Sequence, residues 1–175
     1  MNKYIFKQYD PIFPKLFKKE QQRLKQILGH KYPVEHIGST AVPYLDGKGI
    51  IDMMISVPRK LMNQVSQLLQ KQAGYEFSES GGDKERLFHY QDLPDTEESI
   101  RRYHVHVTFF ESESRKRAIA FRDYLIKHPE DLKRYAQIKQ KAAIEASEDR
   151  ETYLAIKQPV IDEIIKKAYT EYSPK

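Results

Sequence analysis

Apolar side chains recur along the chain with two spacings, one typical of helices and one typical of strands. Residues 14–29, PKLFKKEQQRLKQILG, repeat apolar positions every three to four residues, with Pro14 tolerated in a first turn and Gly29 at the end. Residues 60–72 repeat this helical spacing. Short β-rich runs predict strands at 33–39, 49–57, 75–80, 85–92 and 103–111. The first part of the chain should therefore form a sheet with two helices.

The connections between the later strands carry their own signals. Gly81-Gly82 predicts a turn between the strands at 75–80 and 85–92. The polar stretch from Leu93 to Arg102 predicts the loop that leads into the last strand.

From Ser112 onward the spacing is helical. It predicts helices at about 115–127, 129–146 and 150–169, and Pro159 should bend or break the last of them. No linker, repeat array or low-complexity segment interrupts the 175 residues. We therefore expect one domain over 1–175, of class α/β (α+β), with a mixed β-sheet flanked by helices in about 1–111 and a helical half in about 112–175.

Composition narrows the classes of function. Lysine and arginine total 30 against 25 acids, a net charge of +5, which mildly favours anionic ligands such as phosphates. The charges are interspersed at helix-surface spacings, so a nucleic-acid partner is disfavoured. There is no cysteine, which excludes disulfides, thiolate catalysis and zinc sites built on sulfur. No run approaches the ~20 apolar residues that span a bilayer, so we expect a cytoplasmic protein.

The stretch EHIGSTAVPYLDGKGIIDMM, residues 35–54, combines small residues with a buried acid. Gly38, Ser39 and Thr40 form a turn whose hydroxyls and amides suit phosphate oxygens, although a plain strand-to-turn junction is the commoner explanation of this tripeptide by itself. Asp52 lies inside the apolar strand, where a carboxylate is costly unless a cation or hydrogen bonds compensate it. Lys48 could be that compensation, or it could reach a ligand phosphate.

The strand HVHV places His104 and His106 on one face, which suits a pair of metal ligands or a proton donor beside a phosphate. Partly buried histidines bonded to the backbone are the alternative. Arg86, after the Gly-Gly turn, suits a phosphate clamp or an ordinary surface position.

Two patterns in the helical half match each other. YAQIK pairs Tyr135 with Lys139, and YLAIK pairs Tyr153 with Lys157, each pair one turn apart on a single helix face. Two such faces turned toward one loop would form a basic wall for a triphosphate, to which Arg122 could add. Helix-surface packing explains either pattern alone, and Arg122 has a neighbouring acid with which to pair.

These residues together resemble the GrpB family of bacterial proteins over nearly the whole chain. The resemblance rests on EHIGSTAVP, the following lysine, IIDM, Arg86, HVHV, FRDYLIKHPED, YAQIK and YLAIK, in that order. It implies a nucleotidyltransferase-like fold, in which Gly-Ser after the first strand positions a nucleotide's phosphates.

The same resemblance implies a site that lacks part of its acids. Gly38 and Ser39 match the superfamily's Gly-Ser, and Asp52 matches its first metal-binding acid. Met54 stands where the second acid is expected, and His106 stands at the position judged to hold the third. One carboxylate supplies too little charge for two metal ions, whereas a single Mg²⁺ held by Asp52, with His106 as second ligand or proton shuttle, remains feasible.

Two functions therefore stay open. The first is binding of a nucleoside triphosphate or another phosphate-bearing small molecule, with transfer of a nucleotidyl or phosphoryl group to an unknown acceptor. The second is a catalytically degenerate binding or regulatory module, which the resemblance links to coenzyme A metabolism because relatives occur fused to dephospho-coenzyme A kinase. Nothing in the sequence argues for or against a homo-oligomer.

Overall fold

The computed structural model describes residues 7–147 and 149–172, and every predicted helix and strand is present with ends shifted by a few residues. The predicted domain also includes 1–6, 148 and 173–175, which lie outside the described residues. The helices are α1 (Phe13–Leu28), α2 (Met62–Lys71), α3 (Glu113–Lys127), α4 (Pro129–Glu145) and α5 (Arg150–Tyr172). The strands are β1 (Val34–Ile37), β2 (Ile51–Val57), β3 (Glu76–Asp83), β4 (Arg86–Asp95) and β5 (Ser99–Phe109). Two short 3-10 turns, η1 (Ser39–Ala41) and η2 (Arg59–Leu61), follow β1 and β2.

The five strands form one mixed sheet in the order β1-β2-β5-β4-β3. β2 and β5 run parallel in its centre, and the other neighbours are antiparallel. The parallel pair aligns Asp52 with His104 and Met54 with His106, so two segments far apart in sequence share one register. This arrangement confirms the predicted mixed sheet flanked by helices.

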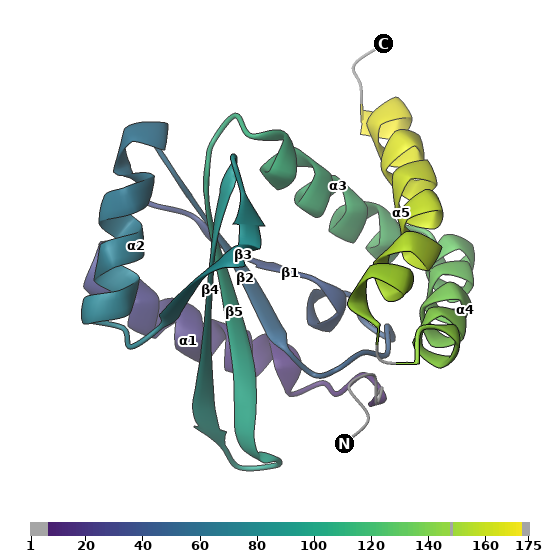
Figure 1. Ribbon diagram of the computed structural model, residues 1–175, viewed down its shortest axis with the longest axis horizontal. Coiled ribbons are helices and arrows are strands. Elements are labelled where there is room, and N and C mark those ends of the chain that lie inside the picture. The colour runs from purple at the N-terminus through teal and green to yellow at the C-terminus, as the bar shows by residue number, and fades with distance from the viewer. Residues whose placement is uncertain (1–6, 148, 173–175) are drawn as a thin grey trace.

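One face of the sheet carries the main core. Side chains alternate between the two faces of a strand, so Ile51, Met53 and Ile55 point together to one side, where they are fully buried. They pack with Leu24 of α1 and Leu69 of α2, and Figure 1 shows these two helices on the same side of the sheet.

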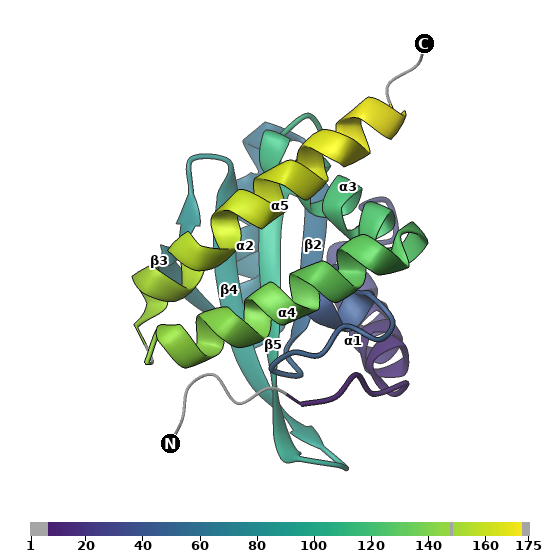
Figure 2. The ribbon, with the colours of Figure 1, turned by 90° about the vertical axis from the view of Figure 1, so that its right-hand side faces the viewer.

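The opposite face carries polar side chains and meets the helical half. Asp52, His104 and His106 point to this side because they alternate with the core residues. Figures 1 and 2 show α3, α4 and α5 gathered over it. Chemistry-bearing side chains of the sheet thus face the helices that carry the two Tyr-Lys patterns.

The expected Gly81-Gly82 turn is wrong in position. β3 continues through both glycines to Asp83, with a register irregularity after Ser78, and the chain reverses between Asp83 and Arg86. The absence of a side chain at Gly81 instead makes room for the Phe88 ring of β4, because a Cβ on Gly81 would lie 2.0 Å from that ring.

The polar loop expected from Leu93 to Arg102 is also shorter than predicted. β4 extends to Asp95 and β5 begins at Ser99, leaving a tight hairpin in which the Asp95 carboxylate accepts hydrogen bonds from the amides of Glu97 and Glu98. This hairpin is polar, so apolar spacing does not reveal its strands.

Pro159 does not break α5, contrary to one of the two outcomes expected for it. Proline removes one backbone hydrogen bond. Buried side chains that follow it, Val160, Ile164 and Ala168, pack against α3 and α4 and hold the helix in place. Neither α5 nor another helix of residues 7–147 and 149–172 has the length and apolar character needed to cross a membrane.

Candidate functional site

A cavity of about 260 Å³ lies where the β1–β2 connection meets α4 and α5. We call it the lysine pocket. Eight of the residues singled out in the sequence line it: Gly38, Ser39, Lys48, Asp52, Tyr135, Lys139, Tyr153 and Lys157. Leu45, Ile50 and Phe121 complete the lining. The two Tyr-Lys faces thus meet the glycine-serine turn in one place.

Position 38 requires glycine because its backbone lies against the Asp52 carboxylate. Its backbone has φ 72° and ψ −169°, a region that only glycine adopts readily. A Cβ at this position would lie 2.5 Å from Asp52 Oδ2. The absence of a side chain therefore lets the Asp52 carboxylate lie directly against the turn that follows β1.

Ser39 is packed in a similar way. A Cβ on Gly47 would lie 2.3 Å from Ser39 Oγ and 3.4 Å from Lys139 Nζ. The second glycine-containing loop thus brings the serine hydroxyl and a lysine ammonium to the same side of the pocket.

The partner of Asp52 within the protein is a histidine. His104 Nδ1 lies 2.9 Å from Asp52 Oδ1, and both side chains remain about a fifth exposed, at 22% and 23%. Burial by itself would raise the pKa of Asp52, but the hydrogen bond and charge of His104 outweigh it and hold that pKa below its ordinary value. Asp52 is therefore ionised at neutral pH, with Oδ2 on the side of the glycine turn.

The three lysines of the pocket approach it from three segments. Lys139 is 5% exposed, and its Nζ donates to the Asp46 carbonyl at 2.7 Å. Lys157 Nζ lies 4.0 Å from the centroid of the Tyr153 ring, and Lys48 Nζ lies 5.6 Å from the same ring. Three ammonium groups thus share the pocket with one carboxylate.

This crowding disfavours the charged lysines. Burial, followed by repulsion from Lys157, lowers the pKa of Lys139 to about 7. Burial, followed by repulsion from Lys48, lowers the pKa of Lys157 to about 8. Asp52 opposes both shifts but does not cancel them. Among the lining residues that the structure describes, three lysines thus accompany one carboxylate, which favours an anionic ligand.

Two of the predicted residues do not line the pocket. The Thr40 hydroxyl donates to the Ile50 carbonyl at 3.0 Å and lies 3.0 Å from His36 Nε2, so it ties the β1 turn to β2. Arg122 donates to the His36 carbonyl at 2.8 Å and pairs with Asp123 at 2.7 Å. Their side chains serve the scaffold around the turn.

His106 and Arg86 also lie apart from the pocket lining. His106 is on the sheet face beside His104, with a ring distance of 6.5 Å, and burial lowers its pKa to about 3. Its Nδ1 is buried without a hydrogen-bond partner among the described residues. Arg86 borders a second cavity. The sequence suggested His104 only as a member of a pair with His106. In the structure, His104 is the histidine that contacts Asp52.

The donor set does not fit a resident magnesium site. Mg²⁺ prefers several oxygen ligands, whereas the pocket offers one carboxylate, of which Oδ1 is engaged by His104. Met54, aligned with His106 on the same face, supplies no oxygen. Within residues 7–147 and 149–172, no three histidine or acidic side chains are grouped as metal ligands.

Comparison with known proteins identifies the family to which the chain is related. A model of the family described as GrpB protein matches residues 4–167. The chain is 33% identical to a UPF0157 protein of Pseudomonas aeruginosa over 91% of its own length and 65% of the relative's, so it spans about two thirds of that protein. It is 32% identical to a UPF0157 protein of Halalkalibacterium halodurans, covering 92% of this chain and 80% of that one.

A solved structure agrees with these matches. The crystal structure of conserved protein GrpB from Enterococcus faecalis superposes with a TM-score of 0.78 at 31% sequence identity, covering 96% of this chain and 99% of that one. The match thus includes the sheet, the turn after β1 and the helical half. The chain belongs to the GrpB family.

Proposed function

We propose that this protein binds a phosphate-bearing small molecule, such as a nucleotide, in the lysine pocket. The observation that carries the proposal is the convergence of Lys48, Lys139 and Lys157 on a pocket with Asp52 as the carboxylate in its lining. A bound phosphate would relieve the mutual repulsion of the ammonium groups and accept charge-assisted hydrogen bonds from them. Ser39, at the glycine turn, would supply a hydroxyl to the same phosphate.

Replacing Lys157 with methionine tests this assignment. Methionine keeps an unbranched apolar stem but removes the ammonium, so the affinity for ATP and for inorganic tripolyphosphate should fall about 10- to 100-fold in titration calorimetry. Lys166→Met is the matched control, because Lys166 is an exposed lysine on the same helix outside the pocket. Absence of binding by the wild-type protein, or equal losses in the two variants, would reject the proposal.

The lowered lysine pKa values predict that binding takes up protons. Lys139 and Lys157 have pKa values of about 7 and about 8 when no anion is bound, and a bound phosphate should raise both. Deprotonation of these lysines should therefore weaken binding as the pH rises from about 6.5 to 8.5, opposite in sign to the strengthening that phosphate ionisation causes. Calorimetry at pH 7.5 in buffers of different ionisation enthalpy measures the uptake, which Lys139→Met should reduce. Binding without net proton uptake would contradict the role given to these lysines.

The second candidate function is a binding module without turnover. It is favoured by the presence of methionine, and not an acid, at position 54. This residue is fully buried at the position where the superfamily resemblance calls for a second acid, and the aligned β5 position holds His106. With Asp52 alone, the protein supplies one carboxylate to any Mg²⁺ that arrives with a nucleotide. We therefore favour binding over nucleotidyl transfer.

Product analysis distinguishes the two candidates. Incubation with each nucleoside triphosphate and Mg²⁺, followed by chromatography, should show no release of pyrophosphate or nucleoside monophosphate above an Asp52→Asn control. Metal-dependent product formation that this variant abolishes would reject the binding module and support transfer.

A further inference from the structure

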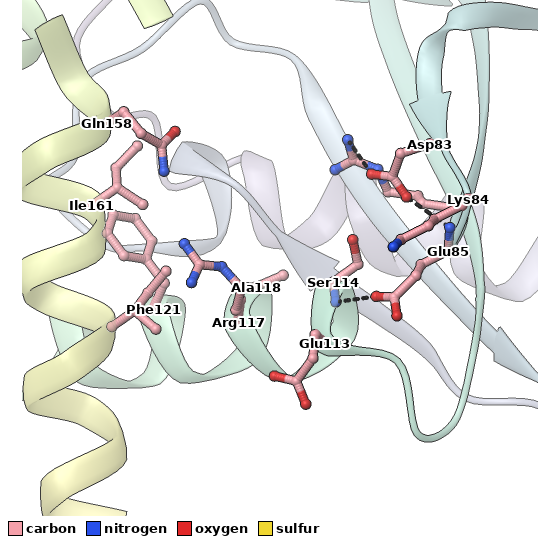
Figure 3. A pocket seen from close by; sticks show the side chains of 12 residues that line it. Asp83, Lys84, Glu85, Glu113, Ser114, Arg117, Ala118, Phe121, Gln158 and Ile161 are labelled. Atoms are coloured by element: carbon pink, nitrogen blue, oxygen red, sulfur yellow. Dashed lines mark hydrogen bonds and ion pairs between the residues drawn. The ribbon is translucent and has the colours of Figure 1, made fainter. Parts of the chain in front are cut away.

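A second and larger cavity adjoins the lysine pocket. It has a volume of about 600 Å³, within the ~300–1,000 Å³ typical of small-molecule sites, and lies between the β3–β4 turn and helices α3 and α5. Figure 3 shows the Phe121 and Ile161 side chains on one side of it and those of Asp83 and Lys84 on the other. Phe121 lines both cavities, and the successive α5 residues Lys157 and Gln158 line one each.

The charge of the second cavity differs from that of the lysine pocket. Its lining has three cationic and three acidic side chains, namely Lys84, Arg86, Arg117, Asp83, Glu85 and Glu113. Several of these are already engaged: Arg117 pairs with Asp162, and Glu85 accepts a hydrogen bond from the Ser114 amide at 3.1 Å. A balanced lining does not attract a second multiply charged group.

The remaining walls are apolar. Ala118 and Phe121 of α3 and Ile161 and Ile165 of α5 form the apolar part of the lining. Exposed apolar walls of this kind favour a ligand group that covers them and displaces water.

Two polar groups on these walls have hydrogen-bonding capacity left. The ion pair of Arg86 is a long one, 3.6 Å from Nη2 to Asp83, and its side chain is 32% exposed, so the end of the guanidinium has capacity for a further hydrogen bond. Gln158 donates through Nε2 to Asp162 at 3.0 Å, which leaves its amide oxygen as an acceptor. One donor and one acceptor thus border a largely apolar space.

We propose that the second cavity holds the uncharged ring of the ligand whose phosphates occupy the lysine pocket, which makes the ligand a nucleoside phosphate. This inference rests on the proposed function, since it assigns the phosphate end to the lysine pocket. The ring packs against Phe121 and Ile161, accepts a hydrogen bond from Arg86 and donates one to the Gln158 amide oxygen. Inorganic polyphosphates have no group for this cavity, and sugar phosphates lack the flat apolar faces that its walls would cover.

Calorimetry with ATP and tripolyphosphate tests the assignment. The wild-type protein should bind ATP at least about tenfold more tightly than tripolyphosphate at equal pH and salt. Ala118→Leu fills the second cavity and should weaken ATP about tenfold while tripolyphosphate changes less than about twofold. Ala155→Leu, at an exposed position of α5 outside both cavities, is the control and should change neither affinity.

Gln158→Leu provides a second variant at an exposed position, in case the leucine at 118 disturbs folding. It should also weaken ATP selectively. Equal wild-type affinity for ATP and tripolyphosphate would overturn the inference and leave the proposed function standing. ATP binding indifferent to both cavity variants would overturn it in the same way. Failure of the wild-type protein to bind either compound would overturn both.

Discussion

Gly38→Ala should destabilise the protein by about 3 kcal/mol or more and remove its affinity for phosphate compounds. Two costs combine. The backbone at φ 72° and ψ −169° strains a residue that has a Cβ, and that Cβ would lie 2.5 Å from Asp52 Oδ2. Relief of the contact must move either the turn or the carboxylate, which is hydrogen-bonded to His104. Urea denaturation measures the stability, and calorimetry with tripolyphosphate measures the binding.

Gly29 offers a matched control for the backbone strain. It has φ 83° and ψ 162°, close to the conformation of Gly38, but a Cβ there would meet nothing within 4 Å. Gly29→Ala should therefore cost about 1–2 kcal/mol from strain alone and leave phosphate affinity unchanged. Equal losses of stability in the two variants would mean that the Asp52 contact adds nothing, and the role assigned to Gly38 would be wrong.

The helices and strands were predictable because their spacing is a local property. α1 repeats its apolar positions every three to four residues, and β2 is an apolar β-rich run, so each element shows itself within a short window. The hairpin at Asp95–Ser99 was less clear, because polar side chains and Arg101 stabilise it instead of an apolar repeat. The turn predicted at Gly81 and Gly82 was wrong for a related reason. In the sequence, a glycine that lets two strands lie close together cannot be distinguished from a glycine in a turn.

The pocket lining was partly predictable, since four of its residues come from the two matching Tyr-Lys patterns. Spacing places Tyr135 with Lys139, and Tyr153 with Lys157, on single helix faces. The spacing does not predict toward which part of the fold these two helix faces are turned. That direction is set by the packing of α4 and α5 on α3, through contacts between residues far apart in sequence.

The partner of Asp52 was beyond local reasoning. His104 and His106 lie on the same face of β5, and the register of β5 against β2 decides which of the two histidines contacts Asp52. That register aligns Asp52 with His104. Thr40 and Arg122 fit phosphate chemistry by residue type, yet they are bonded to backbone carbonyls of the surrounding scaffold. Residue type thus indicates what a side chain can do, and long-range packing decides where it does it.

Arg101 connects the sheet to the loop that carries Lys48. Its side chain is 1% exposed and donates from Nε to Asp95 Oδ2 at 2.7 Å, where the aspartate is also 1% exposed. Its Nη1 donates to the Gly49 carbonyl at 2.9 Å. A buried ion pair therefore positions the residue next to Lys48.

Arg101→Met should cost about 3–5 kcal/mol, because it leaves the buried Asp95 carboxylate without its cation. Arg102→Met is the neighbouring control: its ion pair with Asp92 is nearly half exposed, at 48% and 43%, so its loss should cost less than about 1 kcal/mol. Urea denaturation at pH 7 measures both. Release of the Gly49 carbonyl should also weaken tripolyphosphate binding in the first variant and not in the second. Similar losses of stability in the two variants would show that burial does not strengthen this pair.

The stability difference between wild type and Arg101→Met should shrink in acid. The hydrogen bond from Arg101 lowers the pKa of Asp95 to about 2, against 3.8 in the unfolded chain. A carboxyl group with a lowered folded-state pKa stabilises the protein above its unfolded pKa, and this contribution disappears as the pH falls through the folded value. The wild-type protein therefore loses the contribution of this pair between about pH 4 and pH 2, whereas the variant has little of it to lose. Urea titrations at pH 7, 4 and 3 should show a narrowing gap. A gap that stays constant with pH would assign the effect of Arg101 to its bond with the Gly49 carbonyl, because that bond involves no titrating partner.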